Sequence, residues 1–69
     1  MPLHRIVLEI VFSRPEGLSE SKLEEIIRKE YGVEVTKSEL YHILMRLELQ
    51  GLIQVENIGR EFLVKPVRT

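Results

Sequence analysis

The stretch TKSELYHILMRLELQGLI, residues Thr36 to Ile53, carries the signals of a capped amphipathic helix that ends at a glycine and leads into an apolar strand. The hydroxyl of Thr36 can accept a hydrogen bond from the backbone of Glu39, whose side chain can reach back to the Thr36 amide, as in a capping box. Apolar residues recur at helical spacing and form one stripe, which consists of Leu40, Ile43, Leu44 and Leu47. Gly51 can adopt the left-handed conformation that closes a helix. The pattern predicts a helix over residues 37–50, with a strand directly after it.

Two more helices are expected before this one. Pro2 suits a first helical turn, and apolar residues then repeat with the 3.6-residue period until Pro15 disfavours helix near Ser13. Ser19 can cap a second helix, and Gly32 can end it. After the third helix, two β-prone runs surround a loop with Asn and Gly, which predicts a β-hairpin over residues 52–66. The sequence therefore predicts an α+β fold and a single domain over residues 1–69.

Composition limits the classes of protein that this chain can belong to. With 69 residues, 43% of them hydrophobic, it is near the lower limit at which one core folds unaided. It has no cysteine, which excludes disulfides and Cys-based zinc sites and favours a cytoplasmic location. The apolar N-terminal stretch is interrupted by His4, Arg5 and Glu9, so neither a membrane segment nor an export signal is expected. The net charge of -1 leaves any binding of nucleic acid to a local basic patch.

Catalytic and metal-binding patterns are not found in the sequence. It contains no cysteine nucleophile and no aspartate, and its serines are explained as helix caps or turn residues. His4 and His42 belong to different predicted helices, without a carboxylate at the spacing of metal ligands. There is no glycine-rich phosphate loop. We therefore expect neither an enzyme nor a bound metal or cofactor.

The run LYHILMRLELQGLI resembles winged-helix DNA-binding domains, in particular those of MarR-like and PadR-like regulators. These commonly show Leu, two residues, Leu-Glu, two residues and Gly-Leu, which correspond here to Leu44, Leu47, Glu48, Gly51 and Leu52. The resemblance implies a three-helix domain with a C-terminal β-hairpin wing and a short extra strand at Leu18. It also implies that the third helix enters the major groove of double-stranded DNA while the wing reaches a phosphate or the minor groove. By this resemblance, the DNA-binding residues are Lys37, Ser38, Tyr41, His42, Arg46 and Arg60, although each can also be an ordinary solvated residue.

A second pattern on the third helix indicates a protein partner. At 100° per residue, Tyr41, Met45 and Leu49 lie well away from the apolar stripe, and exposed apolar side chains at that spacing are typical of an interface. The alternative is that Met45 and Leu49 tuck under the hairpin or the first helix. The sequence thus favours a small transcription regulator that binds DNA as a homodimer. A protein-interaction module within a larger assembly, or a fragment of a larger regulator or helicase, remain as alternatives.

Overall fold

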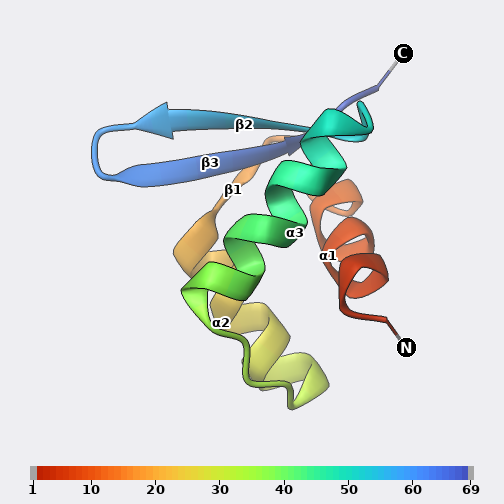
Figure 1. Ribbon diagram of the computed structural model, residues 1–69, viewed down its shortest axis with the longest axis vertical. Helices are drawn as coiled ribbons and strands as arrows, with labels where there is room; N and C mark the ends of the chain where they lie inside the picture. The colour runs from red at the N-terminus through yellow and green to blue at the C-terminus, as the bar shows by residue number, and fades with distance from the viewer. Residues whose placement is uncertain (1, 69) are drawn as a thin grey trace.

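Three helices and a three-stranded antiparallel sheet form the domain (Figure 1). The computed structural model describes residues 2–68. In chain order the elements are α1 (Leu3–Phe12), β1 (Leu18–Ser19), α2 (Glu20–Tyr31), α3 (Lys37–Leu49), β2 (Ile53–Ile58) and β3 (Glu61–Pro66). In the sheet β3 lies between β1 and β2, and the β2–β3 hairpin projects beyond the helices. The predicted three-helix α+β fold with a C-terminal hairpin, including the short strand at Leu18, is confirmed.

The first two helices begin and end where local chemistry predicts. After α1, the Ser13 hydroxyl donates a hydrogen bond to the carbonyl of Ile10 at 2.6 Å. At the start of α2, the Ser19 hydroxyl oxygen accepts a hydrogen bond from the Lys22 amide at 3.1 Å, which satisfies one of the free amides of the first turn. Gly32 ends α2 in the left-handed region, with φ of 66°. Both predicted stops are therefore present.

The third helix has the predicted capping box and a glycine-based C-terminal cap. The Thr36 hydroxyl accepts a hydrogen bond from the Glu39 amide and the Glu39 carboxylate accepts one from the Thr36 amide, both at 3.0 Å. The helix ends at Leu49, one residue earlier than predicted. The amide of Gly51, at φ of 77°, donates to the Glu48 carbonyl, and the next amide donates to the carbonyl of Leu47, which is the bond pair of a Schellman motif. This ending satisfies the last carbonyls of α3 and redirects the chain into β2.

The core receives side chains from all six elements. The buried cluster consists of Ile6, Val7, Ile10, Val11, Leu18, Leu23, Ile26, Ile27, Leu40, Leu44, Leu47, Ile53 and Val64. Burial of this apolar surface is the main stabilising contribution in a domain without disulfides. Because α3 directs its leucine stripe into this core, its opposite face is left at the surface.

A side-chain hydrogen bond joins the hairpin to α3. Strand β2 lies at the edge of the sheet, and its Val55 amide donates a hydrogen bond to the Glu48 carboxylate of α3 at 3.1 Å. At the other end of the hairpin, Ile58 pairs with Glu61, so the turn consists of Gly59 and Arg60. Gly59 has φ of 63°, and no non-glycine residue of the described chain has a positive φ, which fits a type II′ turn. The hairpin is thus held at its base by Glu48 and carries Arg60 at its tip.

The described part of the chain contains no helix with the length and apolar character needed to cross a bilayer.

Candidate nucleic-acid interface

The outer face of α3 carries most of the side chains that the family resemblance predicts to bind DNA. The structure places all of these residues at the surface, together with the wing residue: Lys37, Ser38, Tyr41, His42, Arg46 and Arg60. On the opposite side of the helix, Leu40, Leu44 and Leu47 are at most 2% exposed. The packing of α3 against the core therefore orients the candidate residues outward.

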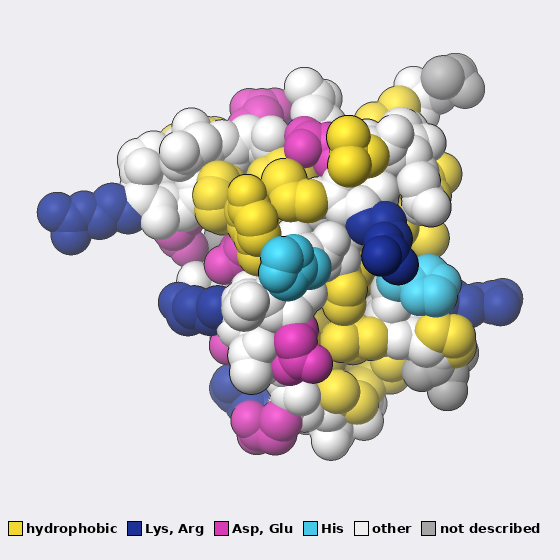
Figure 2. All heavy atoms as spheres, viewed as in Figure 1, with side chains coloured by type: hydrophobic (Ala, Val, Ile, Leu, Met, Phe, Trp, Pro, Cys, Tyr) yellow, Lys and Arg dark blue, Asp and Glu magenta, His cyan; other side chains and the backbone are white. Residues whose placement is uncertain are grey.

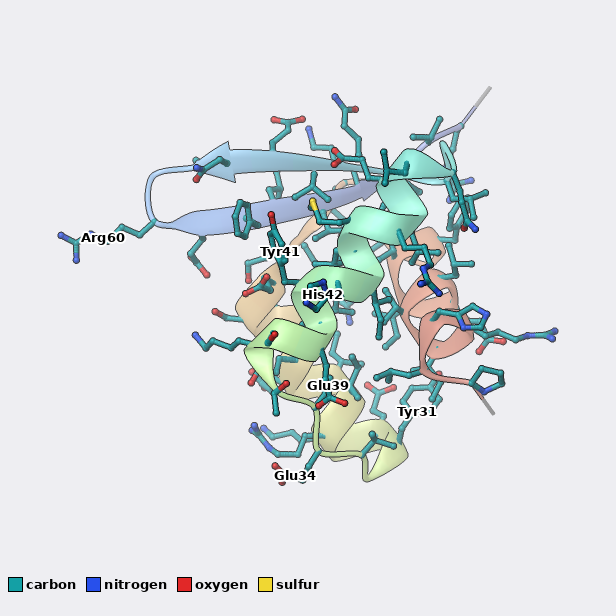
Figure 3. The ribbon with its side chains drawn as sticks, in the orientation of Figure 1. Tyr31, Glu34, Glu39, Tyr41, His42 and Arg60 are labelled. Atoms are coloured by element: carbon teal, nitrogen blue, oxygen red, sulfur yellow. The ribbon has the colours of Figure 1, made fainter. Side chains whose placement is uncertain are left out.

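Three cations of this surface form no ion pair with the residues that the structure describes. The ion pairs found within residues 2–68 join side chains of α1, of α2, or of β2 and β3, and none of them includes Lys37, Arg46 or Arg60. In Figure 3, Arg60 extends away from the hairpin tip. An unpaired surface cation keeps its charge available for an anionic partner. The charge of this face is therefore more positive than the net charge of the chain suggests.

One carboxylate lies at the start of the same helix. Glu39 is exposed, and the hydrogen bond from the Thr36 backbone amide, with a further contribution from the Thr36 hydroxyl, lowers the pKa of Glu39 below its ordinary value of 4.5. Glu39 is consequently ionised at neutral pH, and its carboxylate accepts a hydrogen bond in the helix cap. It reduces the positive charge near Ser38.

Tyr41 joins α3 to the wing. Its ring lies against Phe62 of β3, with centroids 6.2 Å apart, and contacts the ring of His42 edge-on at 6.1 Å. Figure 3 shows Tyr41 reaching from α3 toward the hairpin. The Tyr41 side chain is 43% exposed. These contacts fix the direction of the ring while part of its surface stays in solvent.

The predicted apolar outer face of α3 is only partly correct. Met45 is half-buried and packs against the core, as in the alternative that tucks it inward. Leu49, in contrast, is 89% exposed and contributes nothing to the core. Leu49 lies about 200° around the helix from Leu47, which is buried in the same turn, so the Leu49 side chain points away from the core. Of the predicted interface residues, Leu49 is therefore the one that most clearly offers an apolar contact.

A second apolar surface lies on α1 and was not predicted. Leu8 and Phe12 lie outside the buried stripe of α1 and, with Leu52, line a shallow groove of about 370 Å³ that Arg5 and Glu9 flank. Sequence reasoning missed it because α1 was interpreted only as a core helix. The signal was the spacing of Leu8 and Phe12, which are four residues apart and lie beside the buried stripe at the edge of the core.

The structure also brings together two histidines that the sequence left on separate helices. His4 of α1 and His42 of α3 line a groove of about 280 Å³ with Arg46, over a floor formed by Leu3 and Ile43. Figure 2 shows both histidines on one face, with a cationic side chain between them. This groove extends the candidate interface from α3 to α1.

Comparisons with known proteins agree with the geometry. A solved structure described as "Structural insights into the DNA recognition and protein interaction domains reveal fundamental homologous DNA pairing properties of HOP2" is similar over 93% of this chain and 97% of that chain, with a TM-score of 0.78 and 19% sequence identity. At that identity the likeness shows a shared fold. No curated protein matches the chain. The family model described as "MCM protein C-terminal winged helix-turn-helix domain" matches residues 4–62, and nothing supports the MarR-like or PadR-like branch. Because that match spans most of its length, the chain belongs to the family of MCM protein C-terminal winged helix-turn-helix domains.

Proposed function

We propose that this domain binds double-stranded DNA, with α3 in the major groove and the β2–β3 hairpin as its wing. The observation that carries the proposal is the set of exposed cations on the outer face of α3 and at the wing tip that form no ion pair within residues 2–68, namely Lys37, Arg46 and Arg60. An α-helix with its side chains is about 10–12 Å across and the major groove is about 12 Å wide, so the projecting face of α3 matches the groove.

Each side chain of the face suits a particular contact. Lys37 and Arg46 can bind phosphates or guanine edges, and Ser38 can donate to a phosphate oxygen. Tyr41 is held against the wing, so its hydroxyl is a prearranged donor. Arg60 at the hairpin tip suits a phosphate or a narrow minor groove. The similar HOP2 structure, whose description names DNA recognition, supports this assignment.

We propose two settings for this non-catalytic activity. The sequence favours a small homodimeric transcription regulator, because one such module covers few base pairs. The second setting is a domain of a larger regulator or helicase. The family description favours the second setting, since it names a C-terminal domain of MCM protein.

Titration of a labelled random-sequence duplex at several salt concentrations tests the proposal. Affinity should fall as salt rises, with a slope that counts the neutralised phosphates. Lys37→Ala and Arg60→Ala should each weaken binding and lower that slope by about one. Lys22→Ala is the matched control, because it removes the same charge from α2, where Lys22 pairs with Glu25. Binding that is absent or independent of salt would refute the proposal.

A protein-interaction role is the second candidate, favoured by the 89% exposure of Leu49 and by the apolar groove on α1. Leu49→Glu should then lower the molar mass measured by sedimentation, or abolish capture of a partner, while duplex binding persists. Leu49 is the better target than Met45, since Met45→Glu would place a charge against the core. A protein that is monomeric at high concentration, and a Leu49→Glu variant that captures the same partners, would refute this role.

A further inference from the structure

The groove between α1 and α3 concentrates donors for an anion. Three of its five lining side chains are His4, His42 and Arg46, and the other two, Leu3 and Ile43, are apolar. Imidazole and guanidinium N–H groups donate hydrogen bonds, and guanidinium matches the geometry of phosphate oxygens. Because Leu3 and Ile43 are apolar, the side-chain polar groups that line the groove are these donors. A ligand of this groove should therefore be an acceptor with negative charge.

Within residues 2–68, no carboxylate lines this groove. Helices α1 and α3 contain three acidic residues, Glu9, Glu39 and Glu48, and none of them lines the groove. Glu9 lies 3.8 Å from the Arg5 guanidinium, on the same helix. Glu39 is bound in the cap of α3, and Glu48 accepts the amide of β2. The acids of both helices are thus directed elsewhere, and an anion in the groove would not meet one of them.

The groove and the wing flank α3 on different sides. Tyr41 marks the wing side by its contact with Phe62, and Ile43, which lines the groove, lies about 200° from Tyr41 around the helix. Figure 1 accordingly shows α1 and the tip of the hairpin on opposite sides of α3. A helix inserted in the major groove has a phosphate backbone along each side. The wing can reach one of these backbones and the groove can face the other.

We infer that this groove is a phosphate-binding subsite, in which His4, His42 and Arg46 hold a backbone phosphate of DNA on the side of α3 away from the wing. The inference rests on the proposed duplex binding and adds α1 to the interface through His4. In this inference His4 and His42, which belong to different helices, bind the same phosphate.

The chain offers a sharp comparison of two neighbouring residues. His4→Ala removes a groove donor, whereas Arg5→Ala removes a full charge from the next position of α1 without changing the groove. General electrostatic attraction predicts that Arg5→Ala weakens duplex binding more. The subsite predicts the reverse, with a loss of about threefold or more for His4→Ala, because one phosphate contact is removed. The chain has two histidines, so proton NMR can follow both imidazoles during titration with duplex and, separately, with inorganic phosphate.

Each outcome decides a different point. If duplex shifts both imidazole signals and His4→Ala costs more affinity than Arg5→Ala, the inference is supported. If duplex binds while the His4 signal stays constant and His4→Ala binds normally, the subsite is refuted and the proposed function stands. If duplex does not bind, the proposed function fails and the DNA subsite with it. Inorganic phosphate then shows whether the groove binds anions of any kind.

Discussion

Glu48 offers the most direct test of how α3 positions the wing. Its carboxylate accepts the Val55 amide at 3.1 Å, and this bond joins the last turn of α3 to the edge strand of the sheet. In Glu48→Ala the Val55 amide, which belongs to a half-buried residue, loses this partner. In Glu48→Gln an amide oxygen of the same reach remains as acceptor, although it has no charge. The pair of variants therefore separates the hydrogen bond from the charge.

The expected magnitude follows from opposing contributions. A hydrogen bond to a charged acceptor stabilises a protein by about 1.5–3 kcal/mol, and we take about 2 kcal/mol for this half-buried bond. Alanine recovers a few tenths of a kcal/mol through helix propensity. Removal of an acid from the last turn recovers roughly 0.5 kcal/mol, because the helix dipole disfavours negative charge there. Glu48→Ala should therefore cost about 1 kcal/mol, which in a domain of this size lowers Tm by about 4–8 °C. Glu48→Gln should be nearly neutral.

Thermal unfolding followed by circular dichroism measures the stability difference, and amide hydrogen exchange locates it. In Glu48→Ala the Val55 amide should exchange faster relative to its neighbours in β2, since its acceptor is lost. A Glu48→Ala variant as stable as the parent would show that the bond contributes little. Equal losses in both variants would assign the effect to charge rather than to the bond to Val55.

The remaining predictions concern the two ends of α3, the turn before β1 and the core. Gly51→Ala should cost about 1 kcal/mol in urea unfolding, since φ is 77° but no atom crowds the new Cβ. Gly17→Ala should cost more, because φ is 92° and the Cβ would lie 2.8 Å from a side-chain carbon of β3; equal costs would contradict this. The cap lowers the pKa of Glu39 from 4.5, so its stabilisation is present above pH 4.5 and is lost as pH falls through the lowered value. Glu39→Gln should therefore reduce the stability difference between neutral and acidic pH, and an unchanged pH profile in chemical unfolding would contradict it. Leu44 is 1% exposed, so Leu44→Ala should lower the free energy of unfolding by about 2–5 kcal/mol. Leu49 is 89% exposed, so Leu49→Ala should change it by less than about 0.5 kcal/mol. Similar losses in the two variants would contradict the burial of one face of α3.

The helix boundaries could be predicted because their causes are local. The bonds of the capping box at Thr36 and Glu39 join residues three positions apart, and the left-handed stop at Gly51 needs only the missing side chain of glycine. The antiparallel pairing of Leu18 with β3 is a contact between distant parts of the chain. It came from the family resemblance and not from any local pattern.

The same reasoning explains why the sequence did not identify the correct branch of the winged-helix proteins. In the motif used for that assignment, Leu47 fills the core, Glu48 holds the edge strand and Gly51 closes α3. These are requirements for joining a third helix to a wing in this fold. A motif built from such requirements indicates the fold and does not distinguish the families that share it.

The candidate site was predicted less completely than the fold. Periodicity places Lys37 and Arg46 on the outer face of α3, because one buried stripe determines the orientation of a whole helix. The groove that His4 and His42 share, and the covering of Met45 by the core, depend on how α1 and the hairpin pack beside α3. No local pattern in the sequence encodes how these helices and the hairpin pack together, so both features could be found only in the three-dimensional structure.

The distribution of charge resolves the conflict between the net charge of -1 and the proposed partner. Helix α2 carries four of the eleven acidic residues, and one of them, Glu25, lies within 3.6 Å of two lysines of the same helix. Hydrogen bonding to Lys29, followed by the charge of Lys22, lowers the pKa of Glu25. Its charge is thus compensated by two lysines, whereas the other three acids of α2 are in none of the ion pairs found within residues 2–68. On α3 the Glu39 carboxylate lies in the helix cap and Glu48 at the base of the hairpin, whereas Lys37 and Arg46 form no ion pair within residues 2–68. At physiological ionic strength charges more than about 8 Å apart are largely screened, so a phosphate at the α3 face experiences the local charge of that face more than the total charge of the chain.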